Sequence, residues 1–193
     1  MQVIRYALLG AALFVAACSN NNPPSNDNNA CHIAQERPHW WDAIKASERK
    51  WNAPAHVQMA IIWKESSFRS DVRPRRKYLL WVIPWGRVSS AYGFSQALDG
   101  TWDWYMKSTG NRGADRTDMD DASDFIGWYM NQSRKTNGIA LTDAYNQYLA
   151  YHEGHGGYKR KTYNQKSWLI GVAKQVRRQA ARYEQQLDGC GLG

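Results

Sequence analysis

The sequence has no apolar run long enough to cross a membrane as a permanent helix. Its N-terminal run, from Tyr6 to Ala17, is shorter than the roughly 20 residues that a bilayer requires. We also find no internal repeat and, after that run, little of the polar–apolar alternation typical of strands. At 193 residues the chain is too short for two comfortable domains. The sequence therefore predicts one mainly α-helical domain with a substantial core.

The N-terminus has the pattern of a secretory signal. Arg5 precedes the short apolar run, and small residues end it. The segment Val15-Ala16-Ala17-Cys18 resembles the lipobox of bacterial lipoproteins. The resemblance implies that residues 1–17 are a signal peptide and that Cys18 becomes the lipidated first residue, which anchors the protein to a membrane. A plain signal peptide with an unmodified cysteine is the alternative.

The residues after Cys18 are polar and rich in asparagine and proline, so they cannot contribute to a core. We therefore predict a flexible tether over residues 18–30 and a folded domain over residues 31–193. Ser19 follows the cysteine. By resemblance to enterobacterial sorting, this residue implies attachment at the periplasmic side of the outer membrane.

Cysteine is scarce, with only Cys31 and Cys190 left beyond Cys18. They lie at the two ends of the predicted domain, in what would be an oxidising compartment. A disulfide between them is the simple prediction, and two free thiols are the alternative. In the chain-entropy model, a bond that closes so long a loop stabilises the fold by up to about 5 kcal/mol.

Acidic residues are outnumbered, and the formal net charge is +8. Basic proteins often bind nucleic acid, but a secreted, tethered protein rarely meets it, so we expect no nucleic-acid partner. Acidic peptide stems of peptidoglycan and anionic lipid surfaces are the expected acidic partners. The ten tryptophans and eleven tyrosines are also suited to stacking on sugar rings.

Apolar periodicity predicts helices at residues 39–50, from residue 54 onward, and at residues 101–107, 121–135, 142–153 and 167–187. Thr142 is the expected cap of the fifth, and Gly154 its expected end. Residues 72–90 differ. They contain a basic cluster, residues 73–77, followed by apolar residues that include Trp81 and Trp85. We expect a long loop or short hairpin that forms one wall or a lid of a cleft, or else a hydrophobic plug.

Glu65 is the first residue to explain, because it falls on the apolar stripe that runs from Val57 through Ile61 to Phe68. A carboxyl on such a face lies in a core or a cleft, where desolvation raises its pKa and retains a proton near neutral pH. A general acid that acts on a glycosidic oxygen needs that property. The alternative is an ion pair with Arg69, one helical turn away.

Three sequence segments resemble the soluble lytic transglycosylases and goose-type lysozymes. The segment Glu65-Ser66-Ser67-Phe68 is similar to the Glu-Ser-x-Phe motif of this family. Ala91-Tyr92-Gly93-Phe94-Ser95-Gln96 resembles its Ala-x-Gly-Leu-Met-Gln block. Ala150-Tyr151-His152-Glu153-Gly154 resembles its Ala-Tyr-Asn-Ala-Gly block. The order and spacing fit across roughly residues 50–160. The resemblance implies a lysozyme-like, goose-type helical fold with the residue 72–90 segment beside the cleft.

The resemblance also implies an activity and its residues. Glu65 would be the sole catalytic acid and base, cutting the glycan of peptidoglycan without a cofactor. The expected substrate-binding residues are Ser66, Gly93, Phe94, Gln96 and Tyr151. Of these, Tyr151 would face Glu65, and Ala144-Tyr145-Asn146 is an alternative match to that block. The sequence departs from the family pattern in a longer linker, in Asp99 in place of proline, and in His152 and Glu153 in place of Asn and Ala. These departures put cleft shape and substrate preference in question.

Lytic transglycosylases resemble lysozymes that lack the second catalytic carboxylate. Asp99 and Asp103 are the only candidates for such a group, and both fit better as acids at a helix start. His152 and His155 with Glu153 could bind a metal, but no third ligand has convincing spacing, so no metal is expected. A hydrolase of the same fold and an inactive glycan-binding lipoprotein or secretion scaffold are the alternatives to the transglycosylase.

Overall fold

The structure is a computed structural model that describes residues 21–79 and 83–193. The signal peptide, Cys18, Trp81 and the side chain of Trp85 lie outside this description, so the predictions made for them are not tested by it. Within it the protein is mostly helical, as predicted. The elements are α1 (Ala30–Glu36), α2 (Pro38–Trp51), α3 (Ala55–Ser66), β1 (Arg76–Leu79), β2 (Ile83–Arg87), α4 (Asp99–Thr109), α5 (Met119–Asn137), α6 (Ala144–Lys159), a 3₁₀ turn η1 (Thr162–Gln165) and α7 (Ser167–Gly189).

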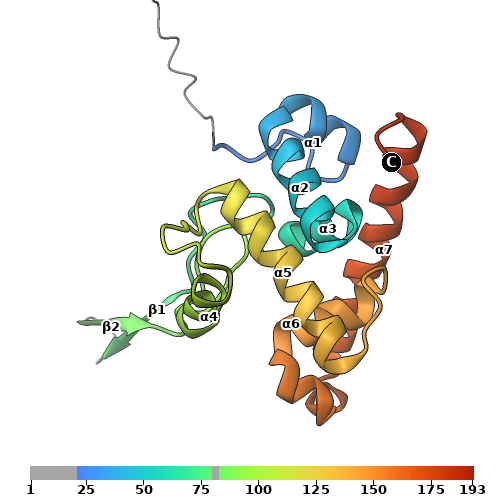
Figure 1. Cartoon of the computed structure of the whole chain (residues 1–193). Coiled ribbons are helices and arrows are strands. Elements are labelled where there is room, and N and C mark those ends of the chain that lie inside the picture. The colour runs from blue at the N-terminus through green and yellow to red at the C-terminus, as the bar shows by residue number, and fades with distance from the viewer. Residues whose placement is uncertain (1–20, 80–82) are drawn as a thin grey trace, which may run out of the picture.

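Helix α5 runs through the middle of the molecule, with α1, α2, α3 and α7 to one side and α4 with the hairpin to the other (Figure 1). It packs most extensively on α2 and also contacts α3, α4 and α6. The Asp118 side chain caps its start by accepting from two backbone amides, and Gly138 ends it in the left-handed conformation. None of the helices described is long and apolar enough to cross a membrane.

The core is unusually aromatic, because several of the tryptophans and tyrosines pack inward. Its largest fully buried rings are Trp40, Phe68, Phe94, Tyr105, Phe125, Trp128 and Tyr183. Trp40 joins α2 to the segments after α3 and after the hairpin, since its ring contacts both Phe68 and Phe94. These contacts hold the two family-like segments against one wall of the core.

Within residues 72–90, the described residues include two paired strands, as expected for the hairpin alternative. Strands β1 and β2 pair antiparallel, with Tyr78 opposite Pro84 and Leu79 opposite Ile83. The hairpin projects beyond α4, at the edge of the molecule (Figure 1). The chain that follows β2 leads directly to Ser89 and Ala91.

Helix α6 differs from its predicted limits. Its cap is Asp143 rather than Thr142, since the Asp143 carboxylate accepts from the amide of Asn146. Gly154 does not end the helix but kinks it, with φ 71° and ψ 159°, and helical structure resumes to Lys159. Only glycine adopts this backbone conformation without a large steric cost.

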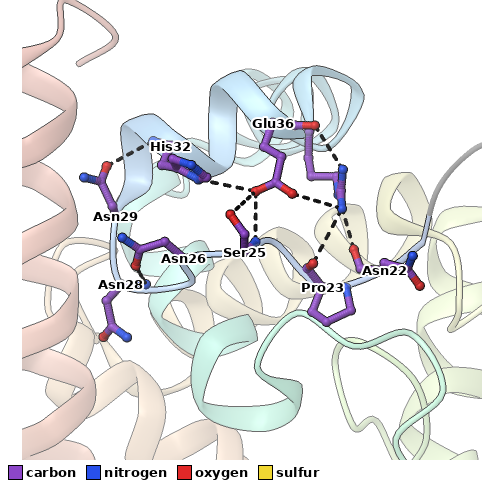
Figure 2. A network of polar contacts seen from close by, with 9 residues as sticks. Asn22, Pro23, Ser25, Asn26, Asn28, Asn29, His32 and Glu36 are labelled. Atoms are coloured by element: carbon purple, nitrogen blue, oxygen red, sulfur yellow. Dashed lines mark hydrogen bonds and ion pairs between the residues drawn. The ribbon is translucent and has the colours of Figure 1, made fainter.

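The segment expected to be a flexible tether makes defined polar contacts with the folded domain from Asn22 onward. Figure 2 shows Glu36 accepting hydrogen bonds from the amide and hydroxyl of Ser25, at 2.9 and 3.1 Å, and pairing with His32. Arg37 donates to the backbone carbonyls of Asn22 and Pro23. Composition alone does not indicate these contacts, because the partners of this polar segment lie on and just after α1, which the sequence pattern did not predict, and on α7.

The two ends of the domain are joined. A disulfide links Cys31 in α1 to Cys190 at the end of α7, with 6.5 Å between the Cα atoms. Around it, Tyr183 donates to the carbonyl of Asp27, and the Gln186 side chain accepts from the amide of Ala30. Helix α7 is therefore fixed to the N-terminal segment by covalent and polar contacts together.

Candidate active site

Glu65 lies in the last turn of α3, on the stripe that the sequence pattern indicated. The helix ends abruptly, because Ser67 and Phe68 both adopt left-handed backbone conformations, with φ of 50° and 58°. Each such residue costs on the order of 1 kcal/mol when it is not glycine. Phe68 holds this turn in place, since its ring is fully buried and stacked on Trp40. Glu65 is thereby presented at the end of a rigid, anchored helix.

Glu65 lines a cavity of about 470 Å³. This volume is in the usual range for sites that bind small molecules. The wall is contributed by α3, α4, α5, α6 and the chain that returns from the hairpin. Its residues are Glu65, Ser89, Ala91, Gln96, Ala97, Leu98, Thr101, Phe125, Tyr129, Tyr151, His152, Glu153 and Gly154. The wall combines aromatic faces with polar groups, which suits a ligand that has both apolar faces and hydroxyl groups.

The Glu65 carboxyl is shifted toward its neutral form. Burial raises its pKa from 4.5 to about 7, while a hydrogen bond from the Tyr148 hydroxyl and the charge of Lys64 partly oppose the rise. A carboxyl with this pKa is protonated in a large fraction of molecules near neutral pH. It can therefore give up a proton and later take one back, which is what a combined acid and base requires.

Tyr151 lines the same cavity as Glu65, whereas Tyr145 is not among the lining residues. The Tyr151 hydroxyl donates to the backbone carbonyl of Ser95 at 2.5 Å. That bond fixes the ring between α6 and the segment that precedes α4. Of the two tyrosines the sequence offered, the structure brings Tyr151 to the carboxylate.

Gln96 also lines the cavity, and its side-chain amide is engaged by the backbone. It donates to the carbonyls of Val72 and Gly93, at 2.9 and 2.8 Å. Gly93 itself has φ 75°, and a Cβ placed there would meet the carbonyl oxygen of Arg116 at 2.0 Å. This close approach requires glycine at position 93, so Gly93 shapes the loop that carries Gln96, and its expected contact with substrate stays a prediction.

Two residues expected to bind substrate are placed elsewhere. Phe94 is fully buried and makes an edge contact with Trp40, so its side chain belongs to the core. Ser66 is 4% exposed, and its hydroxyl donates to the carbonyl of Ile62 one turn earlier in α3. The side chains of both residues are thus engaged within the protein, and their expected role in substrate binding stays a prediction.

A second carboxylate, that of Glu153, lies in the cavity wall. The sequence pattern did not indicate it as a catalytic acid or base. One Glu153 oxygen pairs with Lys166 Nζ at 2.7 Å and with His152 at 3.2 Å, and the other accepts from the Thr162 hydroxyl. Burial alone would raise the Glu153 pKa, but these hydrogen bonds lower it to about 2. Glu153 is therefore a fixed anion with both oxygens in use. By contrast, neither Asp99 nor Asp103 lines this cavity.

The two histidines near the kink are engaged separately. His152 contacts Glu153, whereas Nε2 of His155 lies 3.0 Å from the Ser133 hydroxyl and the ring stacks on Tyr129. Among residues 21–79 and 83–193, no group of three His, Cys, Asp or Glu side chains is arranged to hold a metal ion.

Tyr148 is a neighbour of Glu65 that the sequence patterns did not indicate. It lies one turn before Tyr151 on α6, and its hydroxyl hydrogen-bonds to Glu65. Helical spacing would have placed the two tyrosines on one face, but no motif drew attention to Tyr148. Phe125 and Tyr129, one turn apart on α5, also line the cavity, and no motif in the sequence indicated them.

A comparison with protein families gives a match to the model described as "Transglycosylase SLT domain", over residues 6–190. The match covers nearly the whole chain and includes every residue of the cavity. A search of curated proteins gave no match.

Proposed function

Because the chain belongs to the transglycosylase SLT domain family, we propose that it is a peptidoglycan lytic transglycosylase whose acid and base is Glu65. The reaction would cleave the β-1,4 bond between N-acetylmuramic acid and N-acetylglucosamine and leave a 1,6-anhydro end. The observation that carries the proposal is the state of Glu65, a carboxyl with a pKa of about 7 in the wall of an aromatic cavity.

The proposed reaction uses one carboxyl twice. Protonated Glu65 gives its proton to the glycosidic oxygen, and the bond from that oxygen to C1 of the muramic residue breaks. The resulting Glu65 carboxylate accepts the proton of the C6 hydroxyl of the same sugar, whose oxygen forms the new bond to C1. Glu65 ends protonated as it began, and no water enters the product.

A hydrolase of the same fold would need a second group to activate a water. Among the residues that the structure describes, Glu153 is the one other acid in the cavity wall, but both its oxygens already accept from Lys166, Thr162 or His152. A low pKa also makes it a weak base. These contacts favour the reaction without water. A glycan-binding protein without activity would have no need of the raised pKa of Glu65.

The location is part of the proposal. We propose that Cys18 is lipidated and that the domain acts on glycan strands from the periplasmic side of the outer membrane. Asn22, only four residues beyond Cys18, is already held by Arg37. An anchor at Cys18 would thus keep the domain close to the membrane surface.

The function is tested by digesting purified peptidoglycan in oxygen-labelled water. Products that carry no label and have the mass of anhydro sugars are expected from the wild-type protein. Labelled reducing ends would show hydrolysis instead. Absence of any soluble product from an intact, folded protein would favour the inactive glycan-binding alternative.

A further inference from the structure

Large apolar side chains that face solvent are concentrated around the Glu65 cavity. In the described part of the chain they are Val88, Leu98, Trp104 and Trp168. Leu98 lines the cavity, and Val88 precedes Ser89, which also lines it. Trp104 follows the lining residue Thr101 by one turn of α4. These three residues therefore line the cavity or lie within three residues of one that does.

Trp168 is the most exposed of the aromatic members, with 57% of its surface in contact with solvent. It is the second residue of α7 and lies against His152, with 5.1 Å between ring centroids and an angle of 79° between the ring planes. His152 belongs to the cavity wall. The indole therefore extends the wall outward by one ring.

The position of this indole is fixed by the Glu153 contacts. Glu153 holds the His152 ring on one side and Lys166, two residues before Trp168, on the other. The Glu153 side chain itself is only 3% exposed, whereas the side chains of Lys166 and His152 are 40% and 35% exposed. The start of α7 is thereby clamped to α6 at the rim, which orders Trp168 before any ligand arrives.

We propose that Trp168, braced by His152, is a stacking platform for a pyranose ring of the glycan strand, beyond the ring that reaches Glu65. A pyranose presents an apolar face of C–H groups edged by hydroxyls. The exposed indole can cover that face, and the neighbouring His152 can exchange hydrogen bonds with the edge. This inference rests on the proposed function in taking the ligand to be a glycan.

The test measures binding without cleavage. Full-length Glu65→Gln protein is titrated calorimetrically with chitohexaose, a β-1,4-linked oligomer of N-acetylglucosamine. Adding Trp168→Leu should weaken the affinity about tenfold, the order expected for the loss of one aromatic stacking contact. Trp168→Phe, which keeps a ring, should retain most of the affinity. The melting temperature should change little in either variant, since the side chain is mostly exposed.

Trp41→Leu provides the matched control. Trp41 lies by Glu184 and Asp188, close to the other end of α7 and roughly 25 Å along the helix from Trp168. Its removal should leave chitohexaose affinity unchanged. Three results would overturn the proposal that Trp168 is a stacking platform. They are unchanged affinity in Trp168→Leu, an equal loss of affinity in Trp41→Leu, and no binding of chitohexaose by the Glu65→Gln parent. Release of anhydro sugars by the wild type is measured separately, so a failed platform and a failed function are distinguishable.

Discussion

The chemistry proposed for Glu65 depends on two opposing effects on one carboxyl. Burial against the aromatic wall favours the neutral acid, whereas the Tyr148 hydroxyl and Lys64 favour the anion. The balance gives a pKa of about 7 rather than a permanently protonated group. A carboxyl so poised can serve in both halves of a reaction that needs a donor first and an acceptor second.

Tyr148→Phe tests this balance. The variant removes a hydrogen bond that lowers the Glu65 pKa, so that pKa should rise. Since the protonated carboxyl starts the reaction, the alkaline fall of the pH–rate profile should move to higher pH. The profile of glycan turnover against pH is the measurement. Tyr145→Phe, on the same helix but outside the cavity wall, should leave the profile in place. An unmoved profile in Tyr148→Phe would show that the hydroxyl does not act on Glu65.

The same shift has a consequence for stability. The folded-state pKa of Glu65 lies above its unfolded value, so folding favours the protonated carboxyl, and the protein loses stability as pH rises from about 4.5 to about 7. Glu65→Gln, a neutral mimic, should be no more stable than wild type at pH 4. It should be more stable at pH 8, by at most about 3 kcal/mol. Urea unfolding at both pH values measures the difference, and an equal difference at both would contradict the raised pKa.

Helix α3 shows how much of the candidate site the sequence pattern predicted. Steps of four, four and three residues put Glu65 on the apolar stripe, and the structure agrees. The same family-like segments also include Ser66 and Phe94, whose side chains are buried, because a motif does not separate residues that touch a ligand from those that support the fold. Glu153 was assessed only as a metal ligand. Its partners Thr162 and Lys166 lie beyond the Gly154 kink, and spacing along the chain gives no means of anticipating them.

The loop that carries Gln96 depends on glycine at position 93. Gly93→Ala combines a left-handed backbone with a collision against the Arg116 carbonyl. Gly110→Ala is the matched control, since Gly110 has nearly the same φ, 77°, and nothing within 4 Å of the added carbon. We expect Gly93→Ala to cost about 1–3 kcal/mol more than the control, as overpacking does, and to reduce glycan turnover. Equal losses of stability in the two variants, measured by thermal and urea unfolding, would show that Gly93 does not lie tightly against the Arg116 carbonyl.

At the level of the fold, α7 is held at both ends. Its start is clamped to α6 through Lys166 and Glu153, and its end is bonded to α1 through Cys190. Residues 22–29 pair with Glu36 of α1 (Figure 2) and with Tyr183 and Gln186 of α7. The composition of this segment predicted a flexible tether, and composition does not report partners that lie more than 150 residues away in sequence.

The Cys31–Cys190 disulfide closes a loop of 159 residues. Replacing both cysteines by serine should lower the free energy of unfolding by up to about 5 kcal/mol in the chain-entropy model. Urea unfolding of the two proteins checks this value. Non-reducing mass spectrometry of wild-type protein should show two hydrogens fewer than after reduction. Labelling of both thiols in periplasmic material would mean that the bond is not formed there.

The central claim, that a single carboxyl performs the whole reaction, is tested most directly by Glu65→Gln turnover on purified peptidoglycan. The variant should fold and bind glycan, but release soluble muropeptides at least about a hundredfold more slowly than wild type, the low end for loss of general acid–base catalysis. Glu153→Gln serves as the comparison, and it should keep the anhydro product. Near-normal release of anhydro muropeptides by Glu65→Gln would contradict the account.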